Sequence, residues 1–279
     1  MLKGRKDSEG LLDALTGGEV GEAGQYDAER DQLDREFIGL LKSYLLPVAR
    51  YFRTEVRGVH LLPRESGCLC ISNHTLFGID SVALFTQIYM ETGRVFRGLG
   101  EHALFKLPQV GEVFAKLGAV DGNLENATRL MRAGHWAICY PGGTRDAFKH
   151  KSERYQLKWH GRVGYLRAAL AADVPLVPIA GIGIDDAFVT LGRERKLGRA
   201  LFGSSKYDLP IFVGLGVLPL PVKFTFHVCR PISLSARFGL GPSDADAPSE
   251  ALHEVHMQVW SETQSWINQH LRRRSSRFF

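Results

Sequence analysis

The chain has 279 residues, of which 44% are hydrophobic and 23% charged; this composition is typical of a folded globular protein and excludes a wholly disordered chain. Its formal net charge is +5, but residues 1–35 carry more acidic than basic side chains, so the remainder is strongly basic. A basic body favours anionic partners such as nucleic acid, phosphate-bearing cosubstrates or lipid headgroups, and charge alone does not choose among them.

The N-terminal residues 1–29 are rich in glycine and acidic side chains, and we expect them to form a flexible tail. They lack the apolar core of a signal peptide. Residues 30–53 differ, because apolar side chains recur there at helical spacing with Lys and Arg among them. We predict an amphipathic helix that Pro47 kinks or restarts. Such a helix either lies in a membrane interface or packs on the domain core.

Residues 54–279 alternate between strand-like and helix-like patterns. The predicted strands are Glu55–Val59, Cys68–Ser72, Val95–Leu99, Trp136–Tyr140, Leu176–Ala180 and Lys223–Cys229. The predicted helices are Ser81–Glu91, Val110–Leu117, Asn123–Arg132, Gly161–Ala172 and Ser249–Leu271. Strands that alternate with helices of this length predict an α/β fold with a mostly parallel central sheet flanked by helices.

Two stretches of the C-terminal half suggest contact with lipid. Leu209–Val222 is the longest apolar stretch, and three prolines interrupt it, so we expect a buried loop or a surface that meets lipid. The basic run Arg272–Arg274 suits the C-terminal end of a helix, and it suits anionic lipid equally well. No apolar run reaches the roughly 18 residues that a membrane-spanning helix needs.

The four cysteines, Cys68, Cys70, Cys139 and Cys229, form no Cys-x-x-Cys pair. The sequence therefore favours neither a zinc site nor a redox-active pair. We expect buried free thiols and no bound metal.

The first candidate site follows the apolar run Cys68–Ser72, where Asn73 and His74 are succeeded by Gly78 and Asp80. Polar residues at the carboxyl end of a parallel strand lie where α/β folds place their active sites. A turn at Gly78 brings the Asp80 carboxylate to the imidazole, where it fixes the tautomer and leaves the other ring nitrogen to accept a proton. The alternative is a hydrogen-bonded core histidine and an aspartate that caps a helix.

The second candidate site follows the apolar run Trp136–Tyr140. Gly142 and Gly143 leave backbone amides open to an anion or a developing oxyanion. Thr144 follows them, and the guanidinium of Arg145 suits a phosphate or a carboxylate. The alternative is a plain Gly-Gly turn with a surface arginine.

The two sites together, followed by the Val-Pro-Leu-Val-Pro-Ile run of residues 174–179, resemble the glycerolipid acyltransferase superfamily. The likeness covers residues 50–235 and is greatest to the branch with monoacylglycerol and diacylglycerol acyltransferases and phytyl-ester synthases. That branch is similar in its Asn-His-x-x-x-Gly-x-Asp motif and its Pro-Gly-Gly-x-Arg motif. The phospholipid enzymes of the superfamily instead have one residue fewer between His and Asp, and Glu in place of Gly142. Both differences point away from lysophosphatidate as the acceptor.

The resemblance implies an acyltransferase domain over residues 54–279, in which His74 is the general base and Asp80 orients it. It implies that substrate is bound by Asn73, Gly142, Gly143, Thr144 and Arg145. The donor is then acyl-CoA or acyl carrier protein, used as a co-substrate, and no cofactor is needed. The acceptor is a lipid hydroxyl on a glycerolipid or a long-chain alcohol. The amphipathic helix, the apolar Leu209–Val222 stretch and the basic C-terminus together predict peripheral contact with the cytoplasmic face of a membrane. We expect no nucleic-acid partner, because the sequence has no recognisable nucleic-acid-binding module.

Two other functions stay open on sequence grounds. The first is a lipid esterase or thioesterase, although the Gly-x-Ser-x-Gly elbow of serine hydrolases is absent from the sequence; Cys70 with His74 is a conceivable nucleophile and base. The second is a non-catalytic lipid-binding protein that has kept the fold. Loss of His74 or Asp80 would favour it, and both are present.

Overall fold

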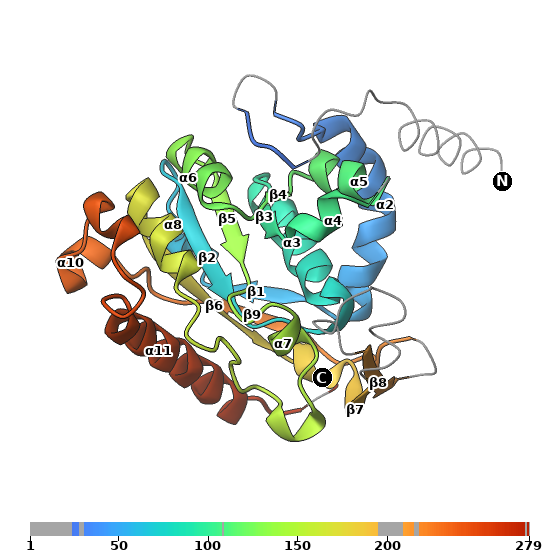
Figure 1. The fold of residues 1–279 in the computed structure, drawn as a ribbon. Coiled ribbons are helices and arrows are strands. Elements are labelled where there is room, and N and C mark those ends of the chain that lie inside the picture. Colours follow the sequence, from blue (N-terminus) through green and yellow to red (C-terminus); the bar gives the residue numbers. More distant parts are fainter. Residues whose placement is uncertain are drawn as a thin grey trace.

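A computed structural model of the protein describes residues 24–27, 31–107, 109–194, 209–214, 218–276 and 278. A seven-stranded sheet with the order β1-β9-β6-β2-β5-β3-β4 forms its centre (Figure 1). The strands are β1 (Glu55–Arg57), β2 (Cys68–Ser72), β3 (Arg97–Gly100), β4 (Val120–Asp121), β5 (Trp136–Cys139), β6 (Leu176–Ile182) and β9 (Thr225–Val228). Neighbouring strands are parallel except β6 and β9, which are antiparallel. The predicted α/β class with a mostly parallel sheet is therefore confirmed.

Helices cover both faces of this sheet (Figure 1). They are α2 (Arg35–Tyr51), α3 (Ile79–Thr92), α4 (His102–Phe105), α5 (Val110–Lys116), α6 (Leu124–Arg132), α7 (Thr144–Ala147), α8 (Gly164–Ala172), α10 (Leu234–Phe238) and α11 (His253–Arg272). The core accordingly has two parts. One lies between the sheet and α6, α8 and α11, and the other lies between the sheet and α3, with α2 packed against α3.

The central strand β2 shows why an unbroken apolar run becomes a buried strand. Leu69 and Ile71 face the core under α6, α8 and α11, whereas Cys68 and Cys70 face the core under α3. All five residues of β2 are buried, because both faces of a parallel sheet are covered. Full burial of an aliphatic side chain contributes about 1.5–3 kcal/mol, so this strand is a strong anchor for the loop that follows it.

Side-chain caps fix where two of the helices begin. The Asp34 carboxylate accepts a hydrogen bond from the Phe37 amide at 2.9 Å at the start of α2. The Asn123 side chain accepts one from the Asn126 amide at 2.8 Å at the start of α6. Each cap satisfies one of the amides that a helix leaves unpaired in its first turn.

Three parts of the sheet structure were not predicted. The two-residue strand β4 is too short to give a sequence pattern. Strands β7 (Val189–Glu194) and β8 (Leu209–Val213) form a separate two-stranded antiparallel sheet. The expectation of a loop over Leu209–Val222 was thus wrong for its first five residues. Pro210 is tolerated because each strand of a two-stranded sheet is an edge strand.

The helix predicted over residues 30–53 is α2, and it runs through Pro47 without restarting. One face of α2 buries Phe37 and Ile38, while Leu40 and Tyr44 are exposed. The helix therefore packs on the domain and still presents apolar side chains outward. Among the described residues, no helix has the length and hydropathy to cross a bilayer.

Residues 24–27 pack against the sheet instead of belonging to a flexible tail. The Gly24 carbonyl accepts a hydrogen bond from the Asp121 amide at 2.7 Å, and the Tyr26 side chain is buried. Close by, Arg97 on β3 donates two hydrogen bonds to the Asp31 carboxylate, at 2.6 and 2.7 Å. The rest of the expected tail, residues 1–23 and 28–29, lies outside the described residues.

Candidate active site

The two candidate loops leave neighbouring strands at the same edge of the sheet. Strands β2 and β5 are parallel, with Ile71 opposite Cys139. His74 follows the end of β2 and Tyr140 follows the end of β5, so the register brings the two loops together. This is the carboxyl edge, where open α/β sheets bind their ligands.

The loop after β2 folds back so that Asp80 reaches His74. The main chain turns through left-handed conformations at Phe77 and Gly78, with φ of 60° and 67°. Asp80 then lies in the first turn of α3, almost fully buried, and its Oδ2 is 2.9 Å from Nδ1 of His74. The sequence expectation of a His–Asp contact thus has a matching geometry, in which Nε2 of His74 is the nitrogen that Asp80 leaves unused.

Charges around His74 set its protonation. Burial alone lowers the pKa of the imidazole, but the carboxylates of Asp80 and Asp146 raise it, and the Lys149 ammonium opposes them. The net effect is a His74 pKa above the ordinary 6.5. The neutral imidazole, which is the form that accepts a proton, therefore predominates only above that raised pKa.

The imidazole ring is also held from its flat side. Tyr140 stacks on it, with ring centroids 4.0 Å apart and planes inclined by 20°. The Ser81 hydroxyl donates a hydrogen bond to the Tyr140 hydroxyl at 2.8 Å, which fixes the tyrosine in turn. Nothing in the sequence pattern indicated Tyr140 as a partner of His74.

The side chain of Asn73 is hydrogen-bonded to the main chain of β6. It is fully buried, its amide nitrogen donates to the Gly181 carbonyl, and its oxygen accepts from the Gly181 amide, both at 2.8 Å. These bonds join the His74 loop to β6. Asn73 therefore positions the loop, and its contact with substrate stays a prediction.

The Gly-Gly turn lies beside His74, but its amides are only partly open. The Gly143 amide already donates to the Tyr140 carbonyl at 2.8 Å, so it is not the free oxyanion donor that was expected. Thr144 begins α7, and the Arg145 side chain is exposed to solvent. Arg162 comes within 3.4 Å of the Gly142 carbonyl and braces the turn from outside.

A buried charge cluster that sequence reasoning missed lies behind the turn. The Lys149 ammonium is 3.2 Å from Oδ1 of Asp146 and 2.9 Å from Oδ2 of Asp185, and all three side chains are buried. Burial opposes the charge on Lys149, but the two carboxylates outweigh it and raise the lysine pKa. Lys149 is thus the partner of two buried carboxylates in an internal ion pair.

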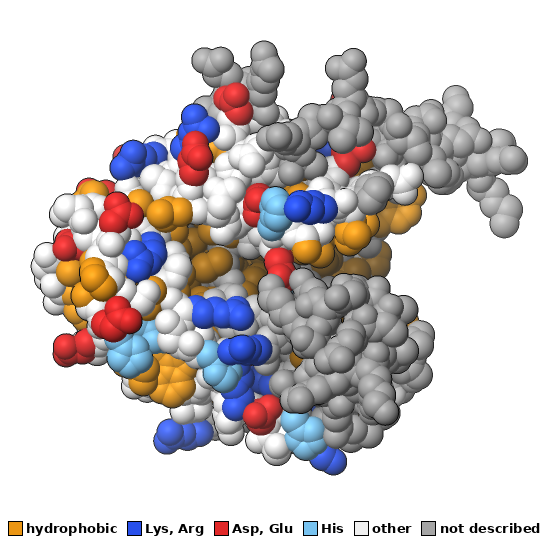
Figure 2. Space-filling view, in the orientation of Figure 1, with side chains coloured by type: hydrophobic (Ala, Val, Ile, Leu, Met, Phe, Trp, Pro, Cys, Tyr) orange, Lys and Arg blue, Asp and Glu red, His pale blue; other side chains and the backbone are white. Residues whose placement is uncertain are grey.

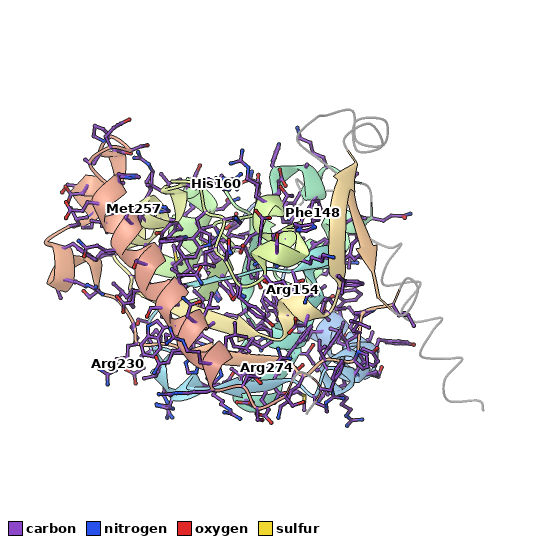
Figure 3. The ribbon with its side chains drawn as sticks, turned by 90° about the horizontal axis from the view of Figure 1, so that it is seen from below. Phe148, Arg154, His160, Arg230, Met257 and Arg274 are labelled. Atoms are coloured by element: carbon purple, nitrogen blue, oxygen red, sulfur yellow. The ribbon has the colours of Figure 1, made fainter. Side chains whose placement is uncertain are left out.

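The C-terminal end of the chain is joined to the same region. Arg274, which follows α11, donates to Asp186 at 2.5 Å, and Arg154 lies 3.3 Å from the other oxygen of that carboxylate (Figure 3). One side chain of the basic run Arg272–Arg274, that of Arg274, therefore forms an internal ion pair.

A small open pocket adjoins the His74 loop. It is lined by Thr75, Leu76, Ala147, Lys149, Lys151, Arg154, Asp185 and Phe188. Figure 2 shows hydrophobic side chains in a recess on this face of the molecule, with Lys and Arg side chains below it. Apolar and cationic groups thus border this pocket, which begins at the residue that follows His74.

The structure supports neither a cysteine nucleophile nor, among the described residues, a metal site. Cys70 is fully buried beside Cys68, and burial raises the pKa of its thiol well above the ordinary value, so it is unsuited to act as a nucleophile. Within the described part of the chain, no group of three or more His, Cys, Asp or Glu side chains is placed to hold a metal ion.

Comparison with known proteins shows which family the chain resembles. The model of the Acyltransferase family matches residues 53–181, which contain both candidate loops. The chain is 29% identical over 265 residues to an uncharacterized protein of Mycobacterium tuberculosis, covering 92% of this chain and 73% of the relative. It is 29% identical over 219 residues to the human DGAT1/2-independent enzyme synthesizing storage lipids, covering 78% and 62%. Phytyl ester synthase 2, chloroplastic, of Arabidopsis thaliana is 26% identical over 246 residues, covering 77% of this chain and 34% of that protein.

The family model and these relatives support the glycerolipid acyltransferase superfamily as the family of this chain. The likeness stated from the motifs is therefore confirmed, and the comparisons support an acyltransferase. The region that the family model matches begins just before β1 and ends in β6, so it contains the His74 loop, the Gly-Gly turn and the strands β2 and β5 that precede them.

Proposed function

We propose that this acyltransferase moves a fatty acyl group from a thioester donor to the hydroxyl of a lipid, with His74 as the general base. The observation that carries the proposal is the 2.9 Å contact between Nδ1 of His74 and the buried Asp80 carboxylate. A histidine oriented by an aspartate, at the carboxyl edge of the sheet and beside an open cavity, is suited to take a proton from a bound hydroxyl.

The proposed reaction is a direct transfer. Nε2 of His74 takes the proton of the acceptor hydroxyl as its oxygen attacks the thioester carbonyl. The tetrahedral adduct then collapses, the carbon–sulfur bond breaks, and the proton on His74 passes to the departing thiolate. Asp80 stabilises the imidazolium between these steps. General-base catalysis of this kind contributes about 10²–10⁴-fold in rate, and much of the rest comes from holding the two substrates together.

The donor in this proposal is acyl-CoA or acyl carrier protein, and the acceptor is a neutral lipid alcohol. Two features support a neutral acceptor: Gly142 stands where the phospholipid enzymes have Glu, and the human relative is named for the synthesis of storage lipids. Monoacylglycerol, diacylglycerol and long-chain alcohols all fit this class. No cofactor takes part, because the thioester already activates the acyl group.

An acceptor panel tests the proposal. Purified protein is incubated with labelled palmitoyl-CoA or palmitoyl-acyl carrier protein and, in parallel, with monoacylglycerol, diacylglycerol, a long-chain alcohol and lysophosphatidate. We expect a labelled neutral ester with at least one neutral acceptor and little product with lysophosphatidate. Transfer to lysophosphatidate alone would contradict the proposed acceptor class, whereas no ester from any pairing would contradict the function itself.

We further propose that the protein contacts the cytoplasmic face of a membrane peripherally. The exposed apolar side chains Leu40, Tyr44 and Tyr51 on α2 support this, because they resemble the lipid-facing side of an interfacial helix. Binding to liposomes that is reversed by high salt or carbonate is the expected result. Replacing Leu40 and Tyr44 with Ser should weaken it. Retention on the liposomes after both washes, or no binding at all, would show that the proposal is wrong.

A further inference from the structure

We infer that Asp146 is a positioning residue of the active site, seated by Gly142, which holds the main chain of His74 in place. The inference rests on the proposed role of His74 as the base. No role for Asp146 was predicted from the sequence, and it touches His74 through the backbone and not through the ring.

The contacts of Asp146 join three separate segments. Its Oδ2 accepts a hydrogen bond from the main-chain amide of His74 at 3.2 Å. Its Oδ1 accepts from the Lys149 ammonium at 3.2 Å and from the Lys158 amide at 3.3 Å. The side chain is completely buried, so these donors, and not water, satisfy the carboxylate. The His74 loop is thereby fastened to the segment that follows the Gly-Gly turn.

Gly142 is required because Asp146 occupies the space beside it. A Cβ atom at position 142 would lie 2.3 Å from Cβ of Asp146 and 2.9 Å from its Cγ. Real side chains do not approach so closely, so any residue other than glycine displaces the carboxylate. The φ of Gly142 is not in the left-handed region, and the requirement is therefore one of space. The first glycine of the Pro-Gly-Gly motif is therefore required for steric reasons, which are distinct from anion binding.

Asp146 also contributes to the charge around His74. The groups that face the imidazole are Asp80 from α3, Tyr140 from the end of β5, Asp146 from α7 and Lys149 from the loop after α7. Asp80 and Asp146 favour the imidazolium, and Lys149 disfavours it. Without the Asp146 charge, one of the two groups that stabilise the imidazolium is lost while the opposing Lys149 charge remains, so the pKa of His74 should fall.

Two variants separate position from charge. Asp146→Asn keeps a hydrogen-bond acceptor but removes the charge. Gly142→Ala keeps every charge but pushes the carboxylate away from its place. Gly164→Ala is the matched control, because a Cβ at the start of α8 meets nothing within 4 Å. Each variant is measured for kcat and KM against pH, and its His74 titration is followed by NMR of ¹³C-labelled histidine, with the signal identified by its loss in His74→Ala.

Asp146→Asn should lower kcat by about 10- to 100-fold with KM changed little, since small displacements of a catalytic group have effects of this size. Its His74 pKa, read by NMR, should lie below that of the wild type. Gly142→Ala should lower kcat similarly while the His74 pKa stays near the wild-type value. Gly164→Ala should behave as wild type.

Wild-type kcat and an unchanged His74 titration in Asp146→Asn would overturn the inference. If that variant does not fold, wild-type kcat in a folded Gly142→Ala protein would overturn it instead. Failure of the proposed function would give a different result, because His74→Ala would then transfer acyl groups at the wild-type rate. The NMR titration does not need turnover, and it tests the link between Asp146 and His74 in that case too.

Discussion

At the scale of single residues, His74 is held from three directions. Asp80 contacts one ring nitrogen, Tyr140 packs on the ring face, and Asp146 holds the main-chain amide. The first two contacts restrict the imidazole ring, and the third restricts the main chain that carries it. The remaining ring nitrogen is therefore presented in a nearly fixed direction, which is the preorganisation that efficient proton transfer needs.

Replacing Asp80 with Asn should change both the rate and its pH dependence. The Asp80 charge raises the pKa of His74, so its removal lowers that pKa and moves the acidic limb of the kcat/KM profile to lower pH. The plateau should fall by about 10²-fold or more, because the imidazolium loses its stabilising partner. Asp173→Asn, at an exposed position, is the control. A profile of unchanged height and position would show that Asp80 does not act through His74.

At the scale of elements, the strands and helices that could be predicted from the sequence are those with long apolar runs or clear periodicity. The runs that became β2, β5 and β6 are buried on both faces, and the flanking helices have clear periodicity, so both were predicted nearly at their observed positions. Strand β4 and the β7–β8 sheet were missed because their strands depend on pairing with distant residues more than on local pattern.

The candidate site was only partly predictable, because local spacing indicates short-range contacts and not long-range ones. The contact between His74 and Asp80 spans six residues and one turn, so spacing indicated it. The contacts of Asp146 with His74, and of Lys149 with Asp185, join residues that are far apart in the chain. Only the register of neighbouring strands brings such residues together, and no local pattern encodes it.

The N-cap of α2 gives a test at this scale. Asp34→Ala removes the acceptor for the Phe37 amide and should lower the free energy of unfolding by about 1 kcal/mol, the usual cost of losing a cap. Asp34→Asn keeps a capping oxygen and should be close to wild type. Urea unfolding of both variants measures the difference. Equal destabilisation by Ala and Asn would show that the charge matters and the cap does not.

At the scale of the whole molecule, the segment before α2 is joined to the sheet by a buried ion pair. Arg97 is almost fully buried on β3, and it donates two hydrogen bonds to Asp31 and one to the Gly118 carbonyl. The pair therefore connects the segment that precedes α2 with β3, the strand beside the edge strand β4. Removing one partner leaves the other charge buried and uncompensated.

Asp31→Asn should consequently destabilise the protein by about 3 kcal/mol at neutral pH. Burial raises the pKa of Asp31, but Arg97 outweighs it, and the folded-state pKa lies below the ordinary 3.8. The unfolded chain therefore binds the proton first, and the stability from this pair is present above about pH 4 and is lost as the pH falls through the folded-state pKa. Urea unfolding from pH 7 to pH 3 should show a smaller acid loss in Asp31→Asn than in wild type. Glu65→Gln, at an exposed site, should keep the full loss.

The most direct test of the account is acyl transfer by purified wild-type protein and by His74→Ala, from labelled palmitoyl-CoA or palmitoyl-acyl carrier protein to the best neutral acceptor. We predict a labelled lipid ester with the wild type and a loss of about 10²-fold or more in the variant, because the general base is gone. An ester formed equally well by His74→Ala would contradict the assignment of the base. Free fatty acid as the sole product, dependent on His74, would contradict acyl transfer and indicate hydrolysis.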